Sequence, residues 1–190
     1  MKILDRIKEW LGRRALLKEA RPDRVPVAKN LGMAVKVGII YAATDEAAHT
    51  QVRNYVKRIK EELGIIKVMA LGYWDEKEPP HYLHPKLNFD VFSLKDLNWY
   101  RIPHGNAVQN FIAEEYDVLI DLTVRDLLPL QYVLAKSKAR FKVGRQSATN
   151  AQFLDMMIDT AGAESLAQLI ANLNKYLLMI NAPKEAHALN

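Results

Sequence analysis

The sequence contains no cysteine among its 190 residues. This absence excludes disulfide bonds, thiolate metal sites, iron–sulfur clusters and a cysteine nucleophile, and it fits a reducing compartment. No apolar run approaches the roughly 20 residues that span a bilayer. A secretory signal peptide is not expected, because charges interrupt the N-terminal apolar positions at Asp5, Arg6, Lys8 and Glu9. A cytoplasmic location is therefore expected, with peripheral contact at the inner membrane surface as the alternative.

Glycine is missing where a nucleotide-binding fold would need it. The turn after the first predicted strand reads YAATDEAAH (residues 41–49) and matches neither G-x-G-x-x-G nor a P-loop. The backbone of this turn therefore cannot approach a phosphate closely. No serine lies in a G-x-S-x-G motif either. These absences exclude a conventional dinucleotide site, a nucleotide-hydrolysing loop and a serine elbow, and no cofactor is expected.

Charge is balanced in most of the chain. The net charge of +5 arises from 27 basic and 22 acidic residues. Residues 1–29 contain nine Lys or Arg and four Asp or Glu, so the rest of the chain contains 18 of each kind. The basic excess thus belongs to the leader, defined here as residues 1–30. Despite a pI of about 9.3, the body is not expected to bind nucleic acid.

The leader contains the pattern of an amphipathic helix over residues 2–18. At 100° per residue, one stripe collects seven apolar side chains: Ile3, Leu4, Ile7, Trp10, Leu11, Ala15 and Leu17. Arg14 falls inside this stripe, where its stem can lie along apolar surface. Residues 21–30, with Pro22 and Pro26, predict a linker. Because exposed stripes of this kind are uncommon, we expect the body, a second subunit or lipid to cover it.

Residues 31–182 are predicted to form one α/β domain, followed by a frayed tail at 183–190. The patterns predict strands at 33–43, 65–74, 89–94, 117–121, 139–145 and 153–159, and helices at 44–63, 106–115, 128–137 and 164–181. This alternation predicts a three-layer, Rossmann-like or flavodoxin-like fold with a mostly parallel sheet. Residues 153–158 are expected to form an antiparallel edge strand beside 139–143, because the connection is too short for a crossover helix.

Seven candidate ligand-binding residues lie at or just beyond the carboxyl ends of predicted strands, where parallel α/β sheets bind ligands: Asp45, His49, Trp74, Asp121, Thr123, Arg125 and Arg145. Asp45 is alternatively the N-cap of the following helix. His49, one helical turn before Arg53, alternatively belongs to a solvated helix face. Asp121 ends a strand that should be buried, so its carboxylate must meet water, loop amides or a cation.

The two arginines of this set are candidate anion ligands, because a guanidinium binds phosphate or carboxylate through paired hydrogen bonds. Arg125 and Arg145 are alternatively partners of Asp121 and Asp126. A right-handed crossover makes the strands before Asp121 and Arg145 parallel neighbours, so both residues are expected at one edge of the sheet. There they would pair with each other or hold an anionic ligand.

A metal site is not predicted. His81 and His84 lie near acidic residues in a loop at 75–88. This loop contains three prolines and no cysteine, and closed zinc sites use more constrained ligand spacing.

Two stretches resemble known families. The pattern LNWYRIP … FIAEEYDVLIDLT … PLQYVLAKSKARFKVGR … FLDMMID … LIANLNKYL, within about residues 35–180, resembles an uncharacterised family of small proteins from Bacteroidetes. Its members also tend to begin with a basic helical segment like KEWLGRRALLKEA. Separately, YDVLIDLTVRDLLPLQYVLAKSKARFKVG (residues 116–144) is similar to part of the N-terminal domain of lipopolysaccharide heptosyltransferases. The first resemblance implies fold and lineage without an activity, and the second implies a Rossmann-type strand–helix–strand unit.

Two functions are compatible with these features. The first is a non-enzymatic binding or adaptor protein that docks through its basic N-terminal helix on a protein partner, on its own subunit in a homodimer, or on an anionic membrane. The second is an enzyme, or the remnant of one, that binds an anionic small molecule such as a sugar nucleotide or a phosphate at the strand ends.

Overall fold

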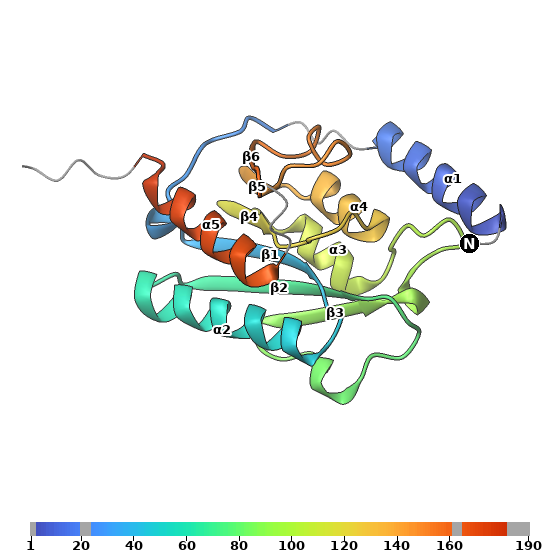
Figure 1. Cartoon of the computed structure of the whole chain (residues 1–190), viewed down its shortest axis with the longest axis horizontal. Helices are drawn as coiled ribbons and strands as arrows, with labels where there is room; N and C mark the ends of the chain where they lie inside the picture. The colour runs from blue at the N-terminus through green and yellow to red at the C-terminus, as the bar shows by residue number, and fades with distance from the viewer. Residues whose placement is uncertain (1–2, 20–23, 161–164, 182–190) are drawn as a thin grey trace, which may run out of the picture.

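The computed structural model of this chain describes residues 3–19, 24–160 and 165–181. Its centre is a six-stranded sheet (Figure 1) made of β1 (Lys36–Ala42), β2 (Lys67–Trp74), β3 (Phe89–Ser93), β4 (Val118–Asp121), β5 (Phe141–Arg145) and β6 (Met156–Ile158). The α-helices of the described residues are α1 (Ile3–Glu19), α2 (Glu46–Leu63), α3 (Asn106–Ala113), α4 (Leu128–Lys136) and α5 (Leu166–Met179). The predicted α/β class is confirmed. The predicted frayed tail at 183–190 lies outside the described residues.

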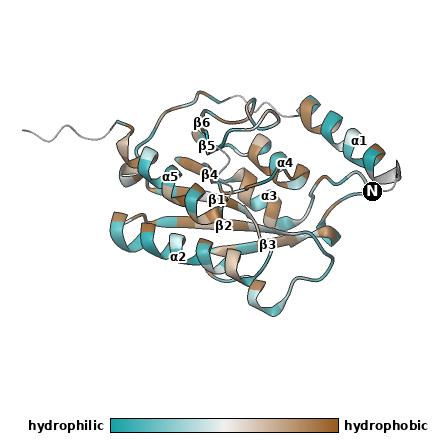
Figure 2. Cartoon of the chain, viewed as in Figure 1, coloured by the Kyte–Doolittle hydropathy of each residue, from teal (hydrophilic) through white to brown (hydrophobic). Residues whose placement is uncertain are grey.

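The helices cover both faces of the sheet. On one face, α2 and α5 bury an apolar cluster with β1, and on the other face α3 and α4 bury a second cluster with the same sheet. Apolar residues accordingly concentrate along the central strands in Figure 2, while α2 is largely hydrophilic on its outer side. Strand β1 is buried on both faces from Val37 to Tyr41, as its continuous apolar run predicts.

The strand order decides where the sheet has a crevice. The order is β3-β2-β1-β4-β5-β6, and all of the described strand pairs are parallel. The chain therefore moves outward from β1 to β3 and then returns to β4 on the other side of β1. This is the doubly wound order in which ligands bind where the direction reverses, beyond the carboxyl ends of β1 and β4.

The prediction of an antiparallel edge strand is wrong, because β6 runs parallel to β5 with Val143 opposite Met156 and Arg145 opposite Ile158. Since β6 pairs only with the last three residues of β5, the chain has to return about 10 Å, which needs no helix. Residues 146–155 make this return as a loop of turns. Asp155 fixes its end: its N–H donates to the Lys142 carbonyl, and its carboxylate accepts from the Lys142 N–H, both at 2.8 Å.

Helix α1 lies against the outer surface of α4, close to the predicted range of 2–18. Its inward side is formed by Gly12 and Leu16. A Cβ atom on Gly12 would overlap the Tyr100 carbonyl oxygen and the Leu128 side chain, so glycine permits this close approach. None of the described helices is both long enough and apolar enough to cross a membrane.

The predicted linker is partly described. Residues 21–23 lie outside the described part, and residues 24–30 form neither helix nor strand. Arg24 forms two 2.8 Å hydrogen bonds with the Asp155 carboxylate, and the Val27 N–H donates to the Arg140 carbonyl at 3.0 Å. This segment is therefore tied to the β5–β6 side of the sheet.

Candidate ligand-binding site at the strand ends

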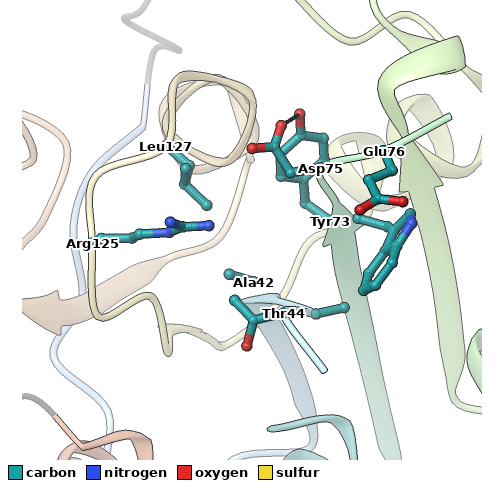
Figure 3. A pocket seen from close by; sticks show the side chains of 9 residues that line it. Ala42, Thr44, Tyr73, Asp75, Glu76, Arg125 and Leu127 are labelled. Carbon is teal, nitrogen blue, oxygen red and sulfur yellow. Dashed lines mark hydrogen bonds between the residues drawn. The ribbon is translucent and has the colours of Figure 1, made fainter. Parts of the chain in front are cut away.

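A pocket of about 240 Å³ opens at the carboxyl ends of β1 and β2 (Figure 3). The ends of these strands contribute Thr44 and the run Tyr73–Glu76, and the segment between β4 and α4 contributes Arg125 and Leu127. The pocket thus lies beside the point where the strand order reverses, as parallel α/β sheets predict. Two of the sequence-predicted candidates, Trp74 and Arg125, line it.

Charged groups face this pocket from two sides. The guanidinium of Arg125 extends into it from one side, and Glu76 lies on the opposite side, with Tyr73 and Asp75 between them (Figure 3). Arg125 makes no hydrogen bond or ion pair with another residue in the described part of the chain. The Trp74 indole N–H is buried and has no acceptor within that part. Because the indole nitrogen is out of reach of solvent, Arg125 is the donor that a ligand in the pocket could reach and that no described protein group satisfies.

Tyr73 supplies a fixed neutral group at the rim. Its hydroxyl donates to the Asp75 carboxylate at 2.7 Å. Burial, and secondly this hydrogen bond, raise the pKa of Tyr73 far above its ordinary value, although Arg101 and Arg125 oppose the shift. The phenol therefore stays protonated at neutral pH and cannot serve as a base.

The helices that follow β1 and β4 begin differently. Asp45 caps α2 by accepting the Ala48 N–H at 2.7 Å, so the alternative role of this residue as an N-cap is confirmed. Glu46 adds a second acidic residue in the first turn. The N-cap of α4 is Leu127, which has no side chain to accept a hydrogen bond, and Arg125 lies two residues before it. An anion is therefore disfavoured at α2 and favoured at α4.

Asp121 lies beneath the surface beside this site. Its carboxylate accepts the Thr123 N–H at 2.9 Å and the Asn150 side-chain amide at 3.2 Å. Burial raises the pKa of Asp121 to about 6, and the bonds to Thr123 and the charge of Arg145 only partly counter this effect. Both Asp121 and Thr123 are buried. The Asp121 carboxylate holds the loop 146–155 against β4 through Asn150, and neither Asp121 nor Thr123 lines the pocket.

Arg145 is engaged by the protein itself. Its guanidinium forms a 2.7 Å ion pair with Asp126 and also donates to the Gln146 carbonyl at 3.2 Å. Asp126 in turn accepts from the Thr149 hydroxyl, so the arginine is tied to the same loop as Asp121. Asp121 and Arg145 lie at the same edge of the sheet, as expected, since Asp121 pairs with Gly144 of β5. The ion pair of Arg145, however, is with Asp126.

His49 is a core residue. It is buried, and its Nδ1 lies 2.8 Å from the Tyr41 hydroxyl, with the Phe89 ring packed edge-on. Burial, with smaller contributions from Arg53 and Lys86, lowers the pKa of His49. The alternative of a solvated helix face is therefore wrong for this residue, because the sheet and the loop after β2 cover that part of α2.

The two histidines of the 75–88 loop lie close together, with His81 Nδ1 3.1 Å from His84 Nε2. A third ligand is missing: within the described ranges, no group of three His, Cys, Asp or Glu residues is placed to hold a metal ion.

Sequence reasoning overlooked a buried polar cluster around α4. The Gln131 side-chain amide donates to Thr149 and to Asn150, both at 2.8 Å. Lys142 on β5 is also buried and donates to the carbonyls of Leu134 and Ala135 at 2.6 and 3.2 Å. Burial lowers the pKa of Lys142 to about 7, and Arg24 adds to the shift. A lysine inside the apolar strand FKVGR was the available signal for this group.

The chain is thus an α/β protein with a parallel sheet and a pocket at the strand ends. Residues 8–180 match a family of unknown function, DUF6913, and the chain belongs to that family. No curated protein and no solved structure matches the chain significantly.

Proposed function

We propose that the chain is a non-enzymatic binding protein that takes a small anionic molecule in the Rossmann-like crevice at the ends of β1, β2 and β4. The observation that carries this proposal is Arg125, an unpaired guanidinium that enters a pocket of about 240 Å³ beside the uncapped start of α4. A carboxylate or phosphate there would satisfy the guanidinium and would meet the positive end of the helix dipole.

The acidic residues that line the pocket together with Arg125 limit the class of ligand that would fit. Asp75 and Glu76 present carboxylates there, and these would repel a ligand that is anionic throughout. Hydrogen-bond donors on the ligand, such as hydroxyl or ammonium groups, would instead be favourable partners for them. The ligand that fits best therefore has one anionic end, directed to Arg125, and a donor-rich end, directed to Glu76. Sugar phosphates, hydroxy acids and amino acids belong to this class.

Size and residue types favour binding of a small molecule without catalysis. A volume of about 240 Å³ lies below the range of roughly 300–1,000 Å³ that is typical of sites for drug-sized ligands, so an entire sugar nucleotide is too large. The lining residues include no histidine, cysteine or serine, and Tyr73 is held as a neutral donor. The pocket lining thus contains no Ser–His or Cys–His pair, and its aliphatic hydroxyl is that of Thr44.

The proposal is tested by thermal shift and titration calorimetry with a hexose phosphate, a hydroxy acid, an amino acid and inorganic phosphate. We expect one of the first three probes to bind more tightly than inorganic phosphate. Arg125→Gln should weaken that binding at least tenfold, because a charged hydrogen bond contributes roughly 1.5–3 kcal/mol. Trp74→Phe, which keeps a smaller aromatic ring in the pocket lining, should weaken it by a smaller factor.

Arg53→Gln is the matched control, since Arg53 is an exposed arginine on α2 that does not line the pocket. Its affinity for the probe should equal that of the wild type. Failure of every probe to bind the wild type would refute an anion site, and equal losses in the Arg53 and Arg125 variants would show that only net charge matters.

A further inference from the structure

Helix α1 presents a second surface, independent of the pocket. Among residues 6–18, whose side chains are described, six are exposed: Arg6, Ile7, Trp10, Arg14, Leu17 and Lys18. We call these six residues the outward face of α1. Three are apolar and three are basic, and none is acidic. The one acidic side chain within this range, Glu9, is half-buried and forms a 2.9 Å ion pair with Arg13.

The body does not cover the apolar part of this face. Ile7, Trp10 and Leu17 are 50%, 57% and 57% exposed, whereas Leu16, on the opposite side of the helix, is 3% exposed. At 100° per residue, the six residues of the outward face fall within an arc of about 120°. The sequence-predicted stripe therefore points largely away from the protein, and α1 is held in place by a different side, through Gly12 and Leu16.

From this arrangement we infer that α1 docks on an anionic lipid surface, lying in the plane of the membrane. An interfacial helix places apolar and aromatic side chains at the boundary of headgroups and acyl chains, while its lysines and arginines reach the headgroups. Trp10 is the residue type that favours this boundary, and Arg14, whose guanidinium lies 5.6 Å from the centre of its ring, is placed to bind a headgroup beside it.

Charge complementarity selects lipid of negative charge. The outward face has three positive charges and, among residues 6–18, no exposed acidic residue accompanies them; each basic residue near an anionic leaflet contributes favourably. A neutral bilayer would leave only the three apolar side chains, which is too little for stable binding by itself. Because α1 is already helical and packs on α4, docking needs no further folding.

Co-sedimentation of the full-length chain with vesicles tests this inference. Vesicles of phosphatidylcholine with 30% phosphatidylglycerol should retain the protein, and vesicles of phosphatidylcholine alone should not. Replacement of the three basic residues of the outward face by glutamine should weaken binding roughly a hundredfold. Replacement of Ile7, Trp10 and Leu17 by serine should abolish it, while circular dichroism and the melting temperature of the body stay close to those of the wild type.

The control variant replaces Arg53, Lys57 and Arg58 by glutamine, because these exposed residues of α2 give the same change in net charge on another helix. It should bind anionic vesicles like the wild type. Trp10→Phe gives a second readout: anionic vesicles should shift the tryptophan emission of the wild type to the blue, and this shift should disappear in the variant.

Three results would overturn the inference: no binding of the wild type to anionic vesicles, equal weakening in the α1 and α2 charge variants, or binding that survives serine at the three apolar positions. The first result would leave the outward face to a protein partner. The pocket proposal would stand in each case, because none of the six residues lines the pocket.

Discussion

The turns that follow β1 and β4 each contain a carboxylate, and the two carboxylates are placed in opposite ways. At β1, Asp45 is exposed and occupies the N-terminus of the next helix by accepting the Ala48 N–H. At β4, Asp121 is turned inward beneath the loop 146–155, and the next helix begins at Leu127 without a side-chain cap. In one doubly wound sheet, therefore, the helix after β1 has a side-chain cap at its N-terminus and the helix after β4 has none. The proposed anion site accordingly lies at the helix after β4.

The largest expected effect is on the pH dependence of stability and concerns the buried carboxyl group of Asp121. Because the folded-state pKa of Asp121 is about 6, above the ordinary value of 3.8, the folded chain binds the extra proton and its stability falls as pH rises between these values. The cost at neutral pH is on the order of 3 kcal/mol. In Asp121→Asn, urea denaturation across pH 4–7 should show this fall removed, whatever constant offset the new amide introduces. A slope equal to that of the wild type would contradict the assignment of a buried, ionisable Asp121.

An acidic cap introduced at the N-terminus of α4 would make it resemble the N-terminus of α2. Leu127→Asp places a carboxylate at the N-cap of α4, so we expect binding of the anionic probe to fall at least tenfold, through competition for the same amides and repulsion. The free energy of unfolding should change by less than about 1 kcal/mol, because the gained cap offsets lost apolar contact. Leu127→Asn is the control for size: if it weakens binding as strongly as aspartate, charge is not the cause.

The smallest effect is expected at the N-terminus of α2, which Asp45 already caps. Asp45→Ala should lower the free energy of unfolding by about 1 kcal/mol, through loss of the cap on α2, measured by chemical denaturation. Asp45→Asn should retain most of that stability. Neither change should open an anion site at α2, since Glu46 remains in the first turn. Probe binding in Asp45→Ala that persists after Arg125→Gln would contradict this view.

Much of the fold could be predicted from local pattern. Continuous apolar runs predicted β1 and β4, and Asp45 and Gly64 marked the ends of α2, where Gly64 adopts a φ of 65°. The direction of β6 could not be predicted, because it depends on how far the strand overlaps β5. A three-residue overlap makes a short parallel return feasible, and chain length between strands does not reveal that overlap.

The strand ends could be predicted as the place of a pocket, whereas the ion pairs among the charged residues there could not. Two of the candidates at the strand ends, Trp74 and Arg125, line a pocket, but the sequence offered two arginines and two aspartates at this edge. Asp126 pairs with Arg145 because Thr149 also donates to it from the loop 146–155, a contact between distant segments. The helical stripe of the leader was likewise correct as a pattern. Its direction depended on Gly12, whose missing side chain decides which side of α1 meets the body.

The shortness of β6 has a consequence for self-association. An edge strand of three residues, followed by the exposed Asp159, offers another chain few backbone groups for pairing. The other edge, β3, contains the half-buried Asp90, and burial already raises the pKa of that carboxyl group. A strand added there would bury the charge further. Both margins of the sheet thus disfavour edge-to-edge pairing with another chain.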